Sequence, residues 1–202
     1  MADRLDSLRR DVRITGGECR GRIIEAPEGL EVRPTASKIR QAFFNILNNI
    51  LIDARFVDIC AGSGLMGIEA LSRGASNLIA IEENKRIAQA IESNLERLGL
   101  HRRAEVIKGE ARRVLPLLSA GEADIIYVDP PYKSTIAEPI IRLVDELSLL
   151  SNHGVLAIEH AAGTRLPENC GHLNNYDRRK WGHTAISFYR RSSEDNAETT
   201  SV

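Results

Sequence analysis

The 202-residue sequence predicts one α/β domain built on a largely parallel β-sheet. From residue 55 onward, short apolar segments alternate with longer segments whose apolar residues recur at helical spacing. A glycine-rich loop follows the first apolar segment, and the fourth ends in two prolines. Because parallel strands need crossover connections, this alternation predicts helices on both faces of the sheet. A hydrophobic content of 43% suits a single core of this size.

The expected elements follow one another in a regular order. A helix from Thr35 places apolar residues between Ile39 and Ile50 on one face. Five strands are expected at Arg55–Asp58, Asn77–Ile81, Ala104–Lys108, Asp124–Val128 and Gly154–Glu159. Four helices are expected at Leu65–Arg73, Lys85–Leu98, Arg112–Leu118 and Ile136–Leu150. Near the end, Leu173–Lys180 and Ala185–Tyr189 are expected to pair as a hairpin.

The ends of the chain differ in composition from this core. We expect residues 1–11 to be frayed and residues 192–202 to form a disordered polar tail. Residues 12–191 then form the single domain. Within it, residues 12–34 mix short apolar pieces with glycine and proline and predict short strands and turns, ahead of the α/β core at 35–191.

Charge and cysteine content limit the possible partners and compartment. The net charge is −1, so any nucleic-acid surface must be local. Arg9–Arg40 holds eight Lys and Arg against five Asp and Glu, and Arg165–Arg191 holds six against two. Three scattered cysteines favour a reducing cytoplasm, and no apolar run is long enough to span a membrane. We expect a cytoplasmic monomer that binds no metal and no membrane.

The glycine loop predicts a nucleotide-like ligand site. Gly62 and Gly64 let the backbone turn tightly and approach a ligand. Glu82 closes the next strand, where a carboxylate can accept both hydroxyls of a ribose. After the third strand, Glu110 and Ala111 are placed to read an adenine, although a surface glutamate opening a helix is as good an explanation.

The loop alone allows two kinds of cofactor. Gly62-x-Gly64-x-x-Gly67 also matches the dinucleotide fingerprint, so a nicotinamide or flavin enzyme competes. Asp58, just before the loop, argues against a dinucleotide cofactor. Its carboxylate would repel a pyrophosphate but suits a ligand that carries ammonium and sulfonium groups, as S-adenosylmethionine does.

The fourth strand ends in Asp129-Pro130-Pro131-Tyr132, which predicts the reaction. The prolines have no N–H, so this turn presents two acceptors, the Asp129 carboxylate and the Pro130 carbonyl. Two acceptors can hold the N–H groups of an exocyclic amine and stabilise the positive charge that develops on the nitrogen during methyl transfer. The Tyr132 ring can stack on the base.

Several short motifs together resemble the bacterial RsmD family, which methylates guanine N2 in 16S ribosomal RNA. The resemblance covers about residues 12–190. The motifs that carry it are Arg13–Arg22, Arg33-Pro34-Thr35, Arg40, Phe44-Asn45, Asp58–Gly67, Glu69–Arg73, Glu82 and Asp129–Tyr132. It implies a class I S-adenosylmethionine-dependent methyltransferase fold, Rossmann-like, with a small N-terminal β-hairpin extension. The implied substrate is the assembling or assembled small ribosomal subunit, so ribosomal proteins could also contribute to binding.

The resemblance also implies roles for individual residues. The cofactor site maps to Asp58, Gly62, Ser63, Gly64, Glu82, Glu110 and Ala111, and the catalytic turn to Asp129, Pro130, Pro131 and Tyr132. We expect the basic residues Arg20, Arg22, Arg33, Lys38 and Arg40 to contact RNA. Two alternatives stay open: an amino methyltransferase acting on adenine N6 of DNA or on a protein glutamine, and a nucleotide-binding assembly factor without catalysis.

Overall fold

The computed structural model describes residues 12–25, 36–131 and 135–192. The expectations of a frayed N-terminus and a disordered tail therefore fall, apart from Ser192, outside the described residues. The predicted roles of Arg33 and Tyr132 lie outside them as well.

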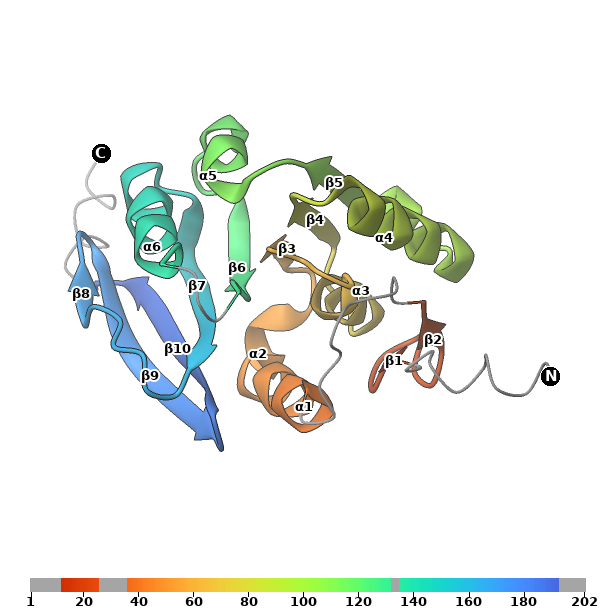
Figure 1. The fold of residues 1–202 in the computed structure, drawn as a ribbon, viewed down its shortest axis with the longest axis horizontal. Helices are drawn as coiled ribbons and strands as arrows, with labels where there is room; N and C mark the ends of the chain where they lie inside the picture. The colour runs from red at the N-terminus through yellow and green to blue at the C-terminus, as the bar shows by residue number, and fades with distance from the viewer. Residues whose placement is uncertain (1–11, 26–35, 132–134, 193–202) are drawn as a thin grey trace, which may run out of the picture.

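The described part of the chain forms one eight-stranded sheet, in the order β5-β4-β3-β6-β7-β10-β9-β8, and a two-stranded sheet of β1 and β2 (Figure 1). The strands of the large sheet are β3 (Arg55–Ile59), β4 (Asn77–Glu82), β5 (Ala104–Lys108), β6 (Ala123–Val128), β7 (Leu150–Ala161), β8 (Asn169–Cys170), β9 (Leu173–Trp181) and β10 (Thr184–Arg191). The pairs among β3 to β7 are all parallel. β10 runs antiparallel to both β7 and β9, so the sheet is mixed.

Helices cover both faces of this sheet, as the alternating pattern predicts. The α-helices are α1 (Ala36–Ile46), α2 (Asn48–Leu51), α3 (Leu65–Ser72), α4 (Lys85–Leu98), α5 (Ala111–Val114) and α6 (Ala137–Glu146), with 3₁₀ turns η2 (His101–Arg103) and η3 (Leu115–Leu117). Two clusters of buried hydrophobic side chains show which helices cover which face of the sheet. In one cluster, helices α1, α2, α3 and α4 pack on one face of the strands. In the other, α5, η3 and α6 pack on the opposite face.

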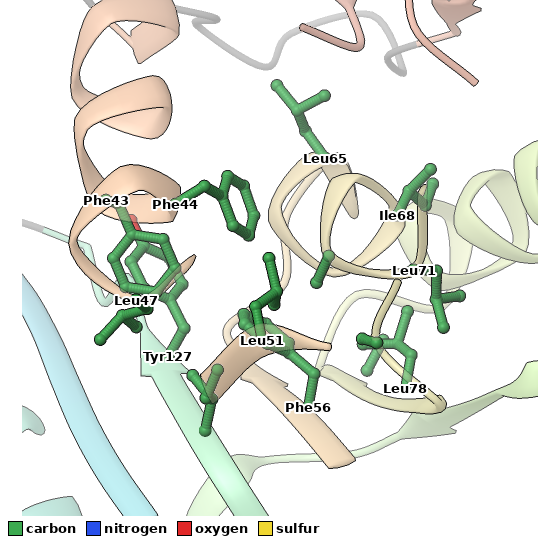
Figure 2. Close-up of a cluster of buried hydrophobic side chains, with 14 of the residues drawn as sticks. Phe43, Phe44, Leu47, Leu51, Phe56, Leu65, Ile68, Leu71, Leu78 and Tyr127 are labelled. Carbon is green, nitrogen blue, oxygen red and sulfur yellow. The ribbon is translucent and has the colours of Figure 1, made fainter. Parts of the chain in front are cut away.

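The cluster under α1 is rich in aromatic rings. Phe43 meets Phe44, Phe56 and Tyr127 edge to face, with ring centroids 5.0–6.4 Å apart (Figure 2). Such pairs add about 0.5–1.5 kcal/mol each beyond simple area burial. The carboxyl end of β6, which carries Tyr127, is therefore firmly packed against α1.

The boundaries of several elements differ from the predicted ones. The first helix breaks at Leu47, so α1 and α2 are separate helices. The helix expected at Ile136–Leu150 ends at Glu146, because Ser148 adopts a left-handed backbone with φ of 50° and turns the chain into β7. Leu147, Leu149 and Leu150 prolong the helical spacing into this turn, which explains the wrong boundary. The short strand β8 was not predicted.

The N-terminal strands form a small hairpin, as the resemblance implies. β1 (Val12–Arg13) pairs antiparallel with β2 (Ile23–Ile24) and packs on α3. Gly17, with φ of 79°, allows this close approach, since a Cβ there would lie 1.8 Å from the carbonyl oxygen of Ser72. The hairpin is thus part of the same hydrophobic core as α1 and α3.

Glu69 on α3 ties three elements together beneath the hairpin. Its fully buried carboxylate accepts bonds from both the backbone and the hydroxyl of Thr15, from Arg40 Nε at 2.5 Å, and from Arg73 Nη2 at 2.7 Å. Arg40 Nη2 in turn donates to the Arg13 carbonyl at 2.8 Å. The hairpin, α1 and α3 therefore share one charged network.

Candidate active site

A cleft of about 550 Å³ opens at the carboxyl ends of the parallel strands. Its walls come from α1, the loop after β3, the ends of β4, β6 and β7, and the loop after β5. They include the predicted site residues Asp58, Gly62, Ser63, Glu82, Glu110, Ala111, Asp129, Pro130 and Pro131. The fold thus brings the predicted side chains at the ends of β3, β4, β5 and β6 together in one cleft, which β7 also borders.

The loop after β3 has the backbone shape that its glycines suggested. Gly62 and Gly64 have φ of 55° and 74°, and Cys60 also adopts a positive φ, of 61°. Gly62 lines the cleft, whereas Gly64 does not: a Cβ on Gly64 would lie 2.9 Å from the side chain of Ile91. Gly64 is therefore needed for packing of α3 on α4, a role that the motif alone did not reveal.

The carboxylate of Glu82 is held in place by backbone N–H groups of two loops, one after β3 and one after β4. Its Oε2 accepts the Gly62 backbone N–H at 2.9 Å, and its Oε1 accepts the Asn84 N–H at 2.8 Å. Asn84 itself caps α4 through its side chain. The carboxylate is thus preorganised at the end of β4, half-buried at the wall of the cleft.

Asp58 is the buried carboxyl of the cleft, 1% exposed, and its Oδ2 accepts the Gly67 N–H at 2.9 Å. Burial raises the pKa of Asp58 well above its usual range, and the nearby carboxylates of Asp129 and Glu82 raise it further. A bound cation would relieve this cost. Burial likewise raises the pKa of the neighbouring Cys60 to about 12, which keeps it a thiol at neutral pH.

Glu110 caps the N-terminus of α5. From the sequence, this capping role and adenine binding explained the residue equally well. Its carboxylate accepts from Arg112 Nε at 2.7 Å, and this hydrogen bond lowers the pKa of Glu110. Glu110 and the buried Ala111 both line the cleft. A contact between Glu110 and adenine stays a prediction, and the carboxylate would have to serve Arg112 at the same time.

The turn after β6 stands at the mouth of the cleft. The Asp129 N–H donates to the Ile59 carbonyl at 3.2 Å, which joins the turn to the end of β3. Asp129 and Pro131 are exposed, whereas Pro130 is buried. The acceptor pair proposed from the sequence is therefore at the cleft wall, next to the loop that carries Gly62.

Two further polar residues of the cleft were not predicted. Tyr127 on β6 donates its hydroxyl to Glu159 Oε2 on β7 at 2.6 Å. A signal was present: Tyr127 stands two residues before Asp129 and so shares its face, and Glu159 is the last residue of the strand expected at Gly154–Glu159, as Glu82 is the last residue of β4. Arg40 and Phe43 of α1 also line the cleft.

The basic residues expected to contact RNA have different surroundings. Arg20, Arg22 and Lys38 are exposed, and Arg22 also reaches the Arg97 carbonyl at 3.3 Å. The structure corrects the expectation for Arg40, which is only 4% exposed and is held by Glu69. Its guanidinium serves the fold and is not presented to an RNA phosphate.

The described lining residues carry a strong acidic excess. They include six carboxyl side chains, Asp58, Glu82, Glu83, Glu110, Asp129 and Glu159, and one guanidinium, that of Arg40. Within the described ranges, no group of three or more His, Cys, Asp or Glu side chains is arranged to hold a metal ion. None of the helices in those ranges is both long and apolar enough to span a membrane.

The strand order, with β10 inserted antiparallel between β7 and β9, and the cleft at the strand ends define a class I S-adenosylmethionine-dependent methyltransferase fold. The solved structure of yhhF from Escherichia coli superposes with a TM-score of 0.81 at 28% identity, covering 90% of this chain and 98% of that one. The methyltransferase SMU.776, solved with SAH bound, shares the fold alone, with a TM-score of 0.66 at 12% identity over 83% of this chain and 52% of its own.

The family described as Conserved hypothetical protein 95 matches residues 12–190, and the chain belongs to this family, that of RsmD and YlbH. YlbH of Bacillus subtilis is 33% identical over 182 residues, covering 89% of this chain and 99% of the relative. Ribosomal RNA small subunit methyltransferase D of Escherichia coli is 29% identical over 187 residues, 93% of each chain. The resemblance inferred from the motifs is thus confirmed.

Proposed function

We propose that this protein transfers a methyl group from S-adenosylmethionine to the exocyclic N2 amine of a guanine in 16S ribosomal RNA. The observation that carries the proposal is the placement of Asp129 and Pro130 on the same cleft as the Gly62 loop and Glu82. A cofactor seated on that loop would bring its methyl group toward the acceptor turn. The family relative from Escherichia coli, a small-subunit methyltransferase by name, supports the choice of substrate.

The charge of the cleft favours S-adenosylmethionine over a dinucleotide. S-adenosylmethionine carries two positive groups and one carboxylate, whereas a nicotinamide dinucleotide brings a doubly negative pyrophosphate. Among the described lining residues, six carboxyl groups face one guanidinium that Glu69 already neutralises. A pyrophosphate here would meet like charges, which cost free energy in a partly buried site. Glu82 is placed for the ribose hydroxyls, and Asp58 for a cationic group of the methionine part.

The chemistry needs only positioning and acceptors. The guanine 2-amine is a weak nucleophile, because its lone pair is delocalised into the ring. Asp129 and the Pro130 carbonyl would accept its two N–H groups, orient the nitrogen for in-line attack on the methyl carbon, and stabilise the positive charge that forms. S-adenosylmethionine would supply the methyl group and leave as S-adenosylhomocysteine, and the methylated amine would pass one proton to water or, along its hydrogen bond, to Asp129. Tyr132 is proposed to stack on the base.

Nucleoside mass spectrometry of small-subunit RNA tests this proposal. Subunits from cells that lack the protein should miss one N2-methylguanosine, and purified protein with S-adenosylmethionine should restore it. Naked 16S RNA, DNA duplexes and a glutamine peptide serve as alternative acceptors. Methylation of DNA adenine or of the peptide in place of the subunit would favour the amino methyltransferases of the alternative reading, and no transfer to any acceptor would favour the assembly factor.

A further inference from the structure

We propose that Glu159 recognises the base to be methylated, accepting a hydrogen bond from the ring N1–H of guanine while Asp129 and Pro130 hold the 2-amine. The assignment rests on the proposed function and adds a determinant of base specificity to it. Glu159 would touch substrate directly, whereas Tyr127 would be a positioning residue that acts through Glu159.

Strand register places Glu159 beside the acceptor turn. β6 and β7 are parallel, and Tyr127 pairs with Ala157 and Val128 with Ile158. Asp129 follows β6 directly, and Glu159 is the next residue of β7, so continuing the register by one step sets them side by side on the face that carries Tyr127 and Ala157. Both line the cleft. Two carboxylates from adjacent strand ends therefore border the space where an amine-bearing base would enter.

Tyr127 restricts the orientation of the Glu159 carboxylate. Its side chain is 2% exposed and packs against Phe43, with ring centroids 5.0 Å apart (Figure 2). Burial raises the pKa of Tyr127 well above its usual range, so the hydroxyl stays protonated and donates to Glu159 Oε2 at 2.6 Å. A carboxylate has about four acceptor positions and can accept several hydrogen bonds at once, the one from Tyr127 among them.

The hydrogen-bonding groups on the edge of each base explain which base such an acceptor would select. In guanine, the 2-amine and the ring N1–H are neighbouring donors on one edge. In adenine and cytosine, the ring nitrogen beside the amine is an acceptor and would meet the carboxylate lone pairs. A polar site built for a donor rejects an analogue that lacks it, because its own group is then left unpaired. Glu159 thus favours guanine where the Asp129 turn alone would accept any exocyclic amine.

A purely structural role is the competing explanation, in which the Tyr127–Glu159 bond only joins β6 to β7. Removing such a bond would change stability but not the choice between bases. The base analogue 2,6-diaminopurine separates the two explanations, because it keeps the 2-amine and replaces the N1–H by an acceptor nitrogen.

The test first maps the methylated guanosine in small subunits. Subunits are then assembled from ligated 16S RNA with guanosine or 2,6-diaminopurine at that position. Single-turnover kcat/KM is measured for the parent protein, Glu159→Gln, Tyr127→Phe and the control Glu96→Gln, which changes an exposed carboxylate on α4. Thermal midpoints and S-adenosylmethionine affinity are recorded for each protein.

We expect the parent and Glu96→Gln to prefer guanosine by about 10- to 100-fold, the range for loss of one base-edge contact. The Glu159→Gln amide can donate to the analogue, so the preference should fall to near one with cofactor affinity unchanged. Tyr127→Phe should reduce the preference by less. Equal use of both bases by the parent, or an unaltered preference in Glu159→Gln, would overturn the assignment and leave the methyl transfer standing. If the parent methylates no small-subunit guanine, both the proposed function and the role assigned to Glu159 are wrong.

Discussion

Replacing Glu69 by glutamine tests whether the buried charged network holds the N-terminal hairpin and α1 on the core. Glutamine has nearly the same size and can still accept from Thr15, so the change removes mainly the charge. Arg40, 4% exposed, would keep its buried guanidinium without a countercharge, whereas Arg73, 19% exposed, can reach water.

The size of the effect follows from this burial. Breaking a buried ion pair by removing one partner costs about 3–5 kcal/mol. For a protein of about 200 residues, each kcal/mol lowers the thermal midpoint by roughly 2–4 °C, so Glu69→Gln should lower it by roughly 6–20 °C. Because Arg40 also lines the cleft, S-adenosylmethionine binding should weaken as α1 loosens.

Urea and thermal unfolding of the full chain measure this change. Glu96→Gln, the same substitution on the exposed face of α4, is the matched control and should stay within about 0.5 kcal/mol of the parent. A Glu69→Gln protein as stable as that control would refute the reasoning, because it would mean that Arg40 needs no buried countercharge.

Four other predictions concern the cleft and the hairpin. Asp129→Ala should lower kcat by about 10²–10³ and Asp129→Asn by less, since an amide oxygen still accepts; parental single-turnover rates would rule out the acceptor turn. Glu82→Ala should weaken S-adenosylmethionine binding by about 10- to 100-fold in calorimetry, and an unchanged affinity in a folded variant would remove Glu82 from the site. Asp58→Asn should raise the free energy of unfolding at pH 7. The folded protein retains the proton of Asp58 above about pH 4, where the unfolded chain releases it, so the gain should shrink toward pH 3; an equal gain at both pH values contradicts the raised pKa. Arg20→Ala combined with Arg22→Ala should weaken binding to small subunits and flatten its salt dependence without changing cofactor affinity, and parental binding across a salt series would exclude an RNA contact.

Local patterns predicted the parts of this protein that depend on neighbours in sequence. The strands β3 to β7 and the helices α3 and α4 follow from hydrophobic spacing, because each buries a face whose period is visible in the chain. The loop from Asp58 to Gly67 and the acid at Glu82 follow from backbone geometry and charge. Element ends were less predictable: the left-handed Ser148 ends α6 early although apolar spacing continues.

Two of the predicted site residues have roles that no local pattern could assign. Arg40 looked like one more exposed basic residue, yet it is buried against Glu69, which lies 29 positions away in the chain. Gly64 looked like a ligand contact, yet it is required by Ile91 of α4. In each case the deciding neighbour comes from another element, and its distance is set by how the helices pack on the sheet.

The sequence by itself indicated which chemical groups this chain can use: a glycine turn, an acid after each of two strands, and a pair of acceptors before an aromatic ring. Which groups share one space was decided only by the tertiary structure. Parallel register set Glu159 beside Asp129, and burial beneath α1 turned Tyr127 into the donor that orients it. The physical reason is that spacing along a chain specifies which face a residue occupies, whereas solvation and contact across strands depend on the completed fold.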